Sequence, residues 1–514
     1  MIELIRKIVS KVYNAELLQQ LSELITGTCA VSSAEDNENL AREIRACLSD
    51  IKVMSPYYRI YLLSVLCGIE NNRDDIVQMI QCTVDATDLS KETKYFLIRQ
   101  YDRIAFVRPE MWSKKAGAAL QALYDQVYEN YKKGLEGMLK PIPKEERNRD
   151  LIVIFTTQFL GERHAPTHST MERCYSLGKL MNKQVLLINT REVLTTLGWM
   201  PFFRYTEANL LEVYNNINSV TYKDYTMEFF QPEMPMPDVN MIQVILAMVA
   251  ELKPWFVLGL GDYSITADLC SNIVPEAALS FGFSALPATQ GQMSILGRQL
   301  FDGELERYME SGFREDKIIE STFTFELHAQ KKHFTRKDLG IPEDKFALVT
   351  IGTRLHDDIT DEFVEHILGT TEWGTHFVIV GNMDTYEQMC ERHEELREHS
   401  TFLGYQDDVL AVLENCDLYV NPRRIGGGFS IVEGFNMNIP GVTIAYGDIA
   451  AAAGKDFWVK DYDEMFATVK RYMEDKVFYQ SQVERAQERV KVLLDGKTAM
   501  EKIVEKIESN SSFF

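Results

Sequence analysis

The chain has 514 residues, of which 46% are hydrophobic and 25% are charged, and its formal net charge is −22. This length exceeds that of one ordinary domain, and the composition is typical of a globular chain of two or three domains. Nucleic acids and anionic membrane surfaces attract clustered lysine and arginine, so the acidic balance excludes general binding to either, although a small anionic ligand remains compatible with a local group of basic residues.

The amino terminus, MIELIRKIVSKVYNAELLQQL, is charged throughout and resembles an amphipathic helix more than a secretory signal. No uncharged apolar window of about 18 residues occurs, so we expect no integral membrane segment. Eight cysteines are scattered without a Cys-x-x-Cys pair, which indicates neither a disulfide framework nor a zinc site. We therefore expect a cytoplasmic protein.

Residues 1–145 are predicted to form an all-helical domain. Apolar residues recur there at spacings of three and four, as in Tyr58, Leu62 and Leu66. No strict period identifies a repeat family, and short helices in antiparallel pairs account for the pattern. Such a domain offers a surface for homo- or hetero-oligomer formation. The proline- and charge-rich segment PIPKEERNRD, at 141–150, predicts a domain boundary.

Residues 151–330 change to alternating strands and helices, which predicts an amino-terminal Rossmann-like domain. Its apolar runs are continuous, as in strands buried on both faces of a parallel sheet. The predicted strands are 151–156, 184–189, 256–259 and 278–283, and the first helix is 170–181.

A second series, at 338–475, predicts a carboxyl-terminal Rossmann-like domain. Two doubly wound halves imply a ligand crevice between them, at the carboxyl ends of the strands. The long, charged helices of 476–514 are expected to pack back across this cleft. The predicted strands are 346–351, 377–380, 418–420 and 442–445, the predicted helices are 361–368 and 386–397, and a further apolar segment is 409–414.

The most informative stretch is CDLYVNPRRIGGGFSIVEGFNMNIPGVTIA, from Cys416 to Ala445. It is typical of a strand, a glycine loop, a helix from 430 to 437 and a second strand. Glycines leave backbone N–H groups unobstructed, and the positive end of the helix faces the loop, which suits a diphosphate. Glu433 lies about one turn inside the helix, where its carboxylate can reach a ribose. A plain tight turn is the alternative interpretation of the three glycines.

From Asp338 to Glu474 the sequence resembles the carboxyl-terminal domain of GT-B glycosyltransferases, in particular those with a Glu-x7-Glu motif. DLGIPEDKFALVTIGTRL is similar to the linker and first strand, HFVIVGN to the second strand, and TFLGYQDDVLAVLENCDLYVNP to the segment that flanks the base. GGGFSIVEGFNMNIPGVTI is similar to the motif helix and the strand after it. The resemblance implies a GT-B fold, with two Rossmann-like domains facing a cleft behind an all-helical domain.

The resemblance also implies a set of donor-binding residues. Glu433 matches the second glutamate of the motif, which accepts hydrogen bonds from the ribose hydroxyls, and Arg354 matches the basic residue on the donor phosphates, following Gly352. A guanidinium fork suits a diphosphate. A surface arginine paired with Asp357 or Asp358 is the alternative for Arg354. The remaining matches are Gly427, Gly428, Phe429 and Ser430 in the loop and Tyr405 beside the base.

Two positions depart from the family pattern. The first glutamate of the motif should lie eight residues before Glu433, where this chain has Ile425, and the lysine commonly found after the first strand is replaced by His356 and its neighbours. We expect Arg423 or Arg424 to supply the lost positive charge. Retention or inversion does not follow from this pattern.

Two histidines are candidates on the acceptor side. FLGERHAPTHST, at 159–170, follows the first strand, where GT-B enzymes place an acceptor-facing loop. His164 or His168 is expected to act as a general base or to orient the transferring sugar, because imidazole exchanges a proton near neutral pH. The alternative is packing on the following helix, with Thr167 or Ser169 as its amino-terminal cap.

Other patterns are assigned structural roles. Asp461-Tyr462-Asp463 imitates the metal-binding Asp-x-Asp motif, but it precedes a helix, so Asp463 is expected to cap that helix. Ser264 and Thr266 are expected to begin a helix, and MEFFQPEMPMPDV, at 227–239, is expected to be a loop. We expect no metal site and no cofactor.

The sequence therefore predicts a metal-independent, hexosyltransferase-type glycosyltransferase that moves a sugar from a nucleotide-diphosphate sugar, a UDP-sugar in the first instance, to a protein or glycan acceptor. Its layout is similar to that of bacterial cytoplasmic protein glycosyltransferases. One alternative is a catalytically inactive GT-B binding or chaperone subunit of a glycosylation complex, which Ile425 favours. A GT-B epimerase or phosphorylase is the other.

Overall fold

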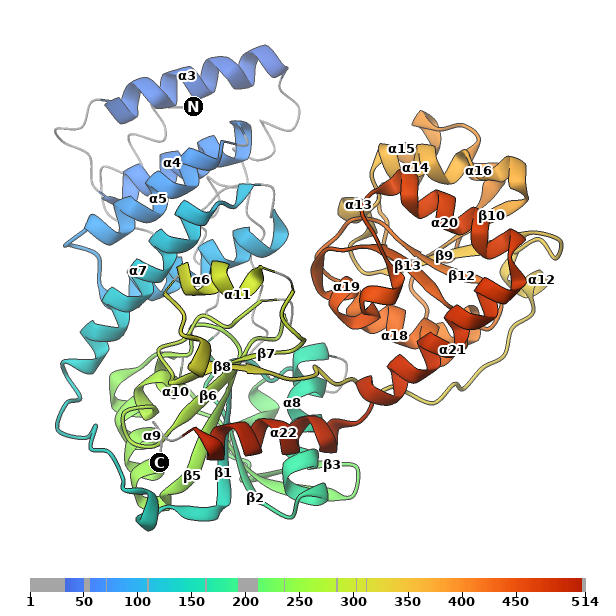
Figure 1. Cartoon of the computed structure of the whole chain (residues 1–514). Coiled ribbons are helices and arrows are strands. Elements are labelled where there is room, and N and C mark those ends of the chain that lie inside the picture. Colours follow the sequence, from blue (N-terminus) through green and yellow to red (C-terminus); the bar gives the residue numbers. More distant parts are fainter. Residues whose placement is uncertain are drawn as a thin grey trace.

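The computed structural model describes residues 33–49, 56–70, 72–108, 111–161, 164–192, 211–234, 236–282, 285–301, 303–310 and 312–510. They form an all-helical domain followed by two Rossmann-like domains, which confirms the predicted α/β class. The helical domain stands on the first Rossmann-like domain, and the second stands beside them (Figure 1). The amphipathic helix expected at the amino terminus lies outside the described residues.

Serine caps help to define the helices of the first domain. The Oγ atoms of Ser90 and Ser113 accept hydrogen bonds from the backbone N–H groups of Thr93 and Ala116, which satisfies a donor in the first turn of each helix. The domain consists of α3 (Ala34–Ser49), α4 (Pro56–Glu70), α5 (Arg73–Asp85), α6 (Lys91–Val107) and α7 (Lys114–Lys132).

The first Rossmann-like domain is built on a sheet in the order β3-β4-β2-β1-β5-β6-β7-β8, parallel except for β3 against β4. Every residue of β5 is buried, as its apolar run predicts. The strands are β1 (Asn148–Thr156), β2 (Gln184–Asn189), β3 (Ser219–Tyr222), β4 (Tyr225–Phe230), β5 (Pro254–Leu260), β6 (Glu276–Leu279), β7 (Met293–Leu296) and β8 (Ile318–Glu320), and the helices are α8 (Ala165–Tyr175), α9 (Val239–Leu252), α10 (Ile265–Cys270) and α11 (Glu304–Glu310), with a π-helical turn at Ser176–Leu180.

The helical domain shares a continuous core with this first Rossmann-like domain, because buried side chains of α3 to α7 join those of α9 and α10 in one cluster. Polar contacts also connect the two. The Tyr124 hydroxyl donates to the buried carboxylate of Asp268, and the Tyr95 hydroxyl donates to the backbone oxygen of Tyr263 at 2.6 Å. The two domains are therefore packed as one body.

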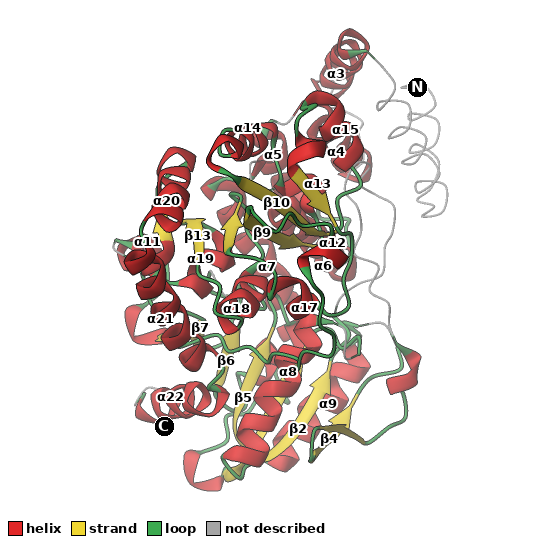
Figure 2. Ribbon diagram, turned by 90° about the vertical axis from the view of Figure 1, so that its right-hand side faces the viewer, coloured by secondary structure: helices red, strands yellow, loops and turns green. Residues whose placement is uncertain are grey.

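The second Rossmann-like domain has a parallel sheet in the order β11-β10-β9-β12-β13-β14. In Figure 2 the strands of both sheets lie among covering helices. The strands are β9 (Phe346–Gly352), β10 (Thr375–Gly381), β11 (Ser400–Phe402), β12 (Leu418–Asn421), β13 (Gly441–Ile444) and β14 (Trp458–Val459), and the helices are α12 (Arg336–Leu339), α13 (Leu355–Asp358), α14 (Asp361–Leu368), α15 (Tyr386–Arg392), α16 (Leu396–His399), α17 (Val409–Leu413), α18 (Gly428–Asn436), α19 (Gly447–Ala453), α20 (Tyr462–Glu474) and α21 (Lys476–Leu493). The last described helix, α22 (Gly496–Ser509), packs on the first Rossmann-like domain.

In each sheet, the strands that follow along the chain are added first on one side of the first strand and then on its other side. This switch lies between β1 and β5 in the first sheet and between β9 and β12 in the second. In open α/β sheets, ligands bind outside the carboxyl ends of the strands at such a switch point, because the two flanking loops diverge there. The loops after these four strands are therefore where a ligand site is expected.

The chain crosses between the Rossmann-like domains twice, and the two crossings are hydrogen bonded to each other. The backbone N–H of Phe325 donates to the backbone oxygen of Leu493 at 2.9 Å. Helix α21 packs on the second domain, whereas α22, next in sequence, lies against the first (Figure 1). Trp255 Nε1 donates to Glu508 Oε1 at 2.9 Å and fixes the end of α22 there.

Several local predictions were wrong. The helix predicted at 170–181 begins at Ala165, and the strand predicted at 278–283 is β6, at Glu276–Leu279. Residues 227–230 belong to strand β4 of a hairpin, not to a loop, and the alternation of buried Val220, Met227 and Phe229 is the strand signal. The cap of α20 is Asp461, whose side chain accepts from the backbone N–H of Glu464, and not Asp463. The motif helix begins at residue 428, not 430.

Two findings concern the part of the chain that the structure describes. No helix there has the combined length and apolar character needed to cross a bilayer. The described cysteines are all free thiols, and six of the seven are buried.

Candidate functional site

The glycine loop lies at the switch point of the second sheet and leads from β12 into α18. Gly427 has φ 96°, which favours glycine. A Cβ atom at this residue would also lie 2.6 Å from Nη2 of Arg424. The backbone can therefore turn sharply only if residue 427 has no side chain, and the turn puts the positive end of α18 beyond the carboxyl end of β12.

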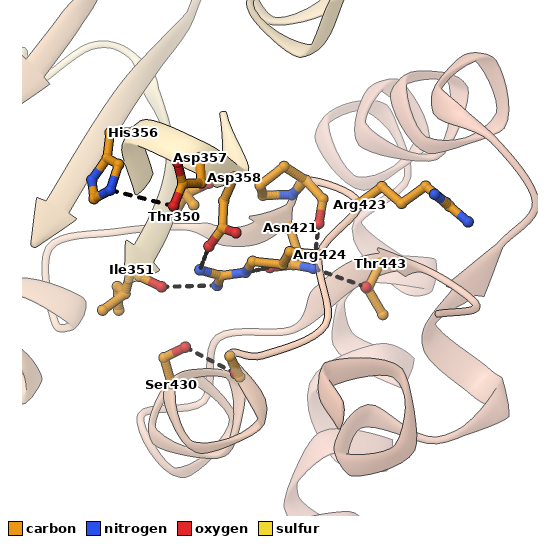
Figure 3. Close-up of polar contacts among 12 residues, drawn as sticks. Thr350, Ile351, His356, Asp357, Asp358, Asn421, Arg423, Arg424, Ser430 and Thr443 are labelled. Atoms are coloured by element: carbon orange, nitrogen blue, oxygen red, sulfur yellow. Dashed lines mark hydrogen bonds and ion pairs between the residues drawn. The ribbon is translucent and has the colours of Figure 1, made fainter. Parts of the chain in front are cut away.

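Arg424 holds this loop in place through its guanidinium group. Its guanidinium donates to the backbone oxygen of Ile351 at 2.8 Å and to Asn421 Oδ1 at 2.7 Å, and it forms an ion pair with Asp358 at 3.3 Å (Figure 3). A third hydrogen bond, at 3.0 Å, reaches the hydroxyl of Tyr419. Because Arg424 is buried and surrounded by these partners, it fixes β9 to the loop.

Ser430 is held inside the first turn of α18. Its hydroxyl donates to the backbone oxygen of Gly427 at 2.9 Å and lies 2.7 Å from the hydroxyl of Tyr419. Phe429, the preceding residue, is 37% exposed and packs edge-on against Phe325 of the interdomain connection, with ring centroids 5.9 Å apart. The loop is thus anchored by Tyr419 on one side and contacts the interdomain connection on the other.

Arg354 lies at the same edge, directly after β9, as the cap residue of α13. Its Nη2 atom is 3.7 Å from the position that a Cβ atom on Gly426 would occupy. Asp358 forms its ion pair with Arg424, and Asp357 pairs with His356 at 3.3 Å. The structure therefore places the Arg354 guanidinium beside the glycine loop.

Glu433 lies one turn into α18 and is half-buried. Desolvation, with a smaller contribution from the negative charge of Asp408, raises the pKa of Glu433 from its ordinary 4.5 to about 8. Within the described ranges, no group donates a hydrogen bond to its carboxylate. A desolvated carboxyl group that accepts no hydrogen bond is a candidate ligand-binding group.

Three other predicted residues lie around this centre. Tyr405 is 63% exposed between β11 and α17. Arg423 is exposed, stacks on the ring of Tyr446 at 4.2 Å and points away from Arg424 (Figure 3). Ile425 accepts a hydrogen bond at its backbone oxygen from the N–H of Asp448 at 2.6 Å. Either Arg423 or Arg424 was expected to supply the missing positive charge. In the structure, the Arg424 guanidinium is engaged in holding the loop, and the Arg423 side chain points away from it.

His164 belongs to the opposing domain, as the cap residue of α8 after β1. Burial lowers the pKa of His164 to about 4, so the imidazole is neutral at pH 7. Its Nδ1 lies 3.0 Å from the hydroxyl of Thr167, which already accepts from the backbone N–H of Leu160 at 2.8 Å. In the tautomer that carries the proton on Nε2, the Thr167 hydroxyl donates to Nδ1, and Nε2–H remains a donor.

His168 lies one turn further along α8. Its ring packs edge-on against the rings of His328 and Tyr222, at centroid distances of 5.2 and 6.2 Å. These neighbours belong to the interdomain connection and to the β3–β4 hairpin. The geometry of His168 is therefore that of a packing residue at the domain junction, as the alternative interpretation predicts for one of the two histidines.

Sequence reasoning missed the residues that hold the loop in place. Asn421, Tyr419 and Asp358 all contact Arg424, yet none belongs to a recognisable motif. The available signal was Asn421-Pro422 at the end of an apolar strand, which marks a turn but not its support. Among the described residues, no group of three His, Cys, Asp or Glu side chains is arranged to hold a metal ion.

Comparison with known proteins gives a family match for one segment of the chain. Residues 348–475 match the model of the family described as glycosyl transferases group 1. No curated protein matches the chain.

Similar solved structures include a glycosyltransferase from Rickettsia africae (12% identity, TM-score 0.49, covering 70% of this chain and 100% of that one) and Anabaena HepE in complex with UDP (12%, 0.45, 70% and 99%). Another is a mutant O-GlcNAc transferase of Thermobaculum terrenum (12%, 0.48, 97% and 98%). We infer no function from similarities at this level. Residues 348–475 thus form a domain that matches the glycosyl transferases group 1 family, and the chain joins it to a second Rossmann-like domain, as in the GT-B fold.

Proposed function

We propose that this chain transfers a sugar from a nucleotide-diphosphate sugar, with a UDP-sugar as the first candidate, to a protein or glycan acceptor without a metal ion. The observation that carries the proposal is the convergence of Arg354, the glycine loop and the desolvated carboxyl of Glu433 at one switch point. The free, mostly buried cysteines favour a reducing compartment, so we propose that the reaction is cytoplasmic.

The donor diphosphate would lie on the glycine loop. The backbone amides of residues 427–430, the positive end of α18 and the Arg354 guanidinium would stabilise the negative charge that builds on the departing diphosphate as the acceptor attacks the anomeric carbon. Glu433 would accept the ribose hydroxyls. These groups are fixed before the substrate arrives, because Arg424 and Ser430 hold the loop, so little reorganisation is needed during the reaction.

His164 would act on the transferring sugar from the opposing domain. Its imidazole is neutral at physiological pH, and Thr167 occupies Nδ1; with the proton on Nε2, the ring would donate to a sugar hydroxyl. Of the two roles predicted for this residue, the geometry favours orientation of the sugar over abstraction of a proton.

A second candidate function is that of a nucleotide-sugar-binding subunit without turnover. Ile425, in place of the first glutamate of the motif, is the observation that favours it. An isoleucine side chain offers the sugar no hydrogen bond. The donor would then be held by its diphosphate and ribose alone.

The test measures nucleoside diphosphate release from a panel of nucleotide sugars, with and without a protein extract as acceptor source, together with thermal shifts for each nucleotide. We expect release from one donor and a severe loss in Glu433→Ala and Arg354→Ala. Glu251→Ala, on the exposed face of α9, and Arg42→Ala, exposed on α3, are the matched controls. Binding without release supports the second candidate, and full activity of both site variants contradicts the assignment.

A further inference from the structure

The connection between β8 and α12 is fixed to the first Rossmann-like domain just before it reaches the second. The backbone N–H of Phe323 donates to the backbone oxygen of Gly297 at 2.8 Å, and the Thr324 hydroxyl donates to Glu172 Oε2 at 3.0 Å. The guanidinium of Arg173 lies over the Phe323 ring, 4.4 Å from its centroid. The connection is therefore held in place up to Thr324.

Helix α8 provides two of these contacts, because Glu172 and Arg173 both belong to it. Both side chains are buried, and they form an ion pair at 3.6 Å. Glu172 also accepts a hydrogen bond from the Ser176 hydroxyl at 3.2 Å. The same helix begins at His164, its cap residue. One helix thus supports both the histidine proposed to orient the sugar and the connection to the second domain.

Phe325, the next residue of the connection, contacts the glycine loop. Its backbone is hydrogen bonded to Leu493 of the second crossing, and its buried ring lies 5.4 Å from the Phe323 ring, between centroids. On its other side the Phe325 ring meets the ring of Phe429, at a centroid distance of 5.9 Å and an interplanar angle of 63°. Phe429 is the second residue of α18. A continuous set of contacts therefore leads from α8 to the glycine loop.

This ring contact restrains a backbone amide of the proposed donor site. The N–H groups in the first turn of a helix have no acceptor within the helix, and those of residues 427–430 are the groups proposed to bind the diphosphate. The ring and the amide of Phe429 share one Cα atom, so a ring held against Phe325 limits the rotation of the amide. An amide that is already oriented binds its ligand with less loss of entropy.

We propose that Phe325 is a positioning residue for the donor, whose ring holds Phe429 and the amides of the glycine loop at a fixed place relative to α8 and His164. This inference rests on the proposed function. It gives the connection between the domains a role in donor binding, beyond joining them. The effect is specific for the diphosphate, because the restrained amides bind phosphate oxygens and not the nucleoside.

A second aromatic contact between the two Rossmann-like domains offers a matched control. Phe301, between β7 and α11, packs edge-on against Trp458 of β14, with ring centroids 4.8 Å apart. Neither residue belongs to the glycine loop. Phe301→Leu therefore removes an aromatic contact between the domains without removing one from the loop.

The experiment measures UDP and uridine affinities by isothermal titration for the full chain, for Phe325→Leu, for Phe429→Leu and for the double variant. We expect each single substitution to weaken UDP binding about three- to tenfold, the range that corresponds to an aromatic pair, with uridine affinity unchanged. Both substitutions remove the same contact, so the double variant should lose no more than the weaker-binding single variant. Phe301→Leu should bind UDP as the parent does.

The outcomes separate this inference from the proposed function. If the parent chain binds neither UDP nor another nucleoside diphosphate, the proposed function itself fails. If the parent binds UDP, any of four results would overturn the positioning role and leave the proposed function standing. These are parental UDP affinity in Phe325→Leu, losses that multiply in the double variant, an equal loss in Phe301→Leu, and a uridine loss as large as that for UDP.

A second comparison applies if Phe325→Leu lowers the melting temperature, since Phe325 is buried. Phe429 is 37% exposed, so its substitution leaves the core intact. Phe429→Tyr keeps the ring and should retain parental UDP affinity, whereas Phe429→Leu should lose about threefold or more. Equal UDP affinities of these two variants would overturn the inference.

Discussion

Glu433 offers the sharpest test of the donor site, because its ionisation and ribose binding must be linked. The pKa of its carboxyl is about 8 in the empty site, so most molecules carry it neutral at pH 7. A ribose that donates two hydroxyl hydrogen bonds prefers the charged carboxylate. Ribose binding is therefore expected to lower the pKa of Glu433 and to release a proton.

The size of the effect follows from the hydrogen bonds. A hydrogen bond to a charged group contributes about 1 kcal/mol more than one to a neutral group, so two bonds favour the ionised carboxylate by about 2 kcal/mol. That difference corresponds to about 1.5 units of pKa, which places the pKa of Glu433 in the complex near 6.5. The affinity for the ribose is then highest above pH 8. It decreases as pH falls from about 8 to about 6.5, by about 30-fold in total.

The assay titrates the full chain with uridine between pH 6 and pH 8.5. Uridine has no phosphate, so phosphate ionisation does not contribute to the pH dependence. Glu433→Gln is expected to remove the dependence, because glutamine does not ionise. 2′,3′-Dideoxyuridine, which lacks both hydroxyls, is expected to bind equally weakly at every pH.

Two results would refute this reasoning. A uridine affinity that is constant across the range in the parent chain means that the ribose does not contact the Glu433 carboxyl. A pH dependence that persists in Glu433→Gln means that another group titrates. Either result would mean that the ribose does not bind to Glu433 of α18.

Four further outcomes are expected. Removing Arg424 leaves a cavity and deprives the half-buried Asp358 of its ion pair, so Arg424→Ala should lower the free energy of unfolding in urea by about 3 kcal/mol, whereas Arg423→Ala should change it by about 0.5 kcal/mol or less. Gly427→Ala requires a strained backbone and displaces the Arg424 side chain, so it should abolish UDP binding in calorimetry and lower the melting temperature. His164→Ala should lower kcat about 100-fold with donor KM unchanged, and the parent kcat should show no titration of His164 between pH 5 and 8. Because the pKa of Glu433 is raised on folding, its stabilising contribution is lost as pH rises toward 8, so Glu433→Gln should stabilise the empty protein by about 1–3 kcal/mol at pH 8 and hardly at pH 5.

The fold was largely predictable because its signals are local. Strands such as β2 and helices such as α14 were predicted with their observed bounds, since continuous apolar runs and apolar stripes reflect burial directly. The β3–β4 hairpin was missed because its turn, Lys223-Asp224, contains no glycine and uses a positive φ at Lys223.

The site was less predictable than the fold, because it depends on contacts between distant residues. The glycine loop and Glu433 follow from a pattern within one segment. The support by Arg424 depends on Ile351 and Asp358, which are far from it in sequence, and the packing of Phe429 on Phe325 joins the loop to the interdomain connection. The spacing of residues within one segment does not predict contacts between distant segments. Such contacts are therefore seen only in the folded structure.

A crystal structure of the full chain with UDP tests the central claim most directly. We predict that the diphosphate lies against the backbone amides of residues 427–430, within hydrogen-bonding distance of Arg354, and that the ribose hydroxyls donate to Glu433. UDP bound elsewhere on the molecule, or in this cleft with its ribose away from α18, would contradict the assignment of the donor site.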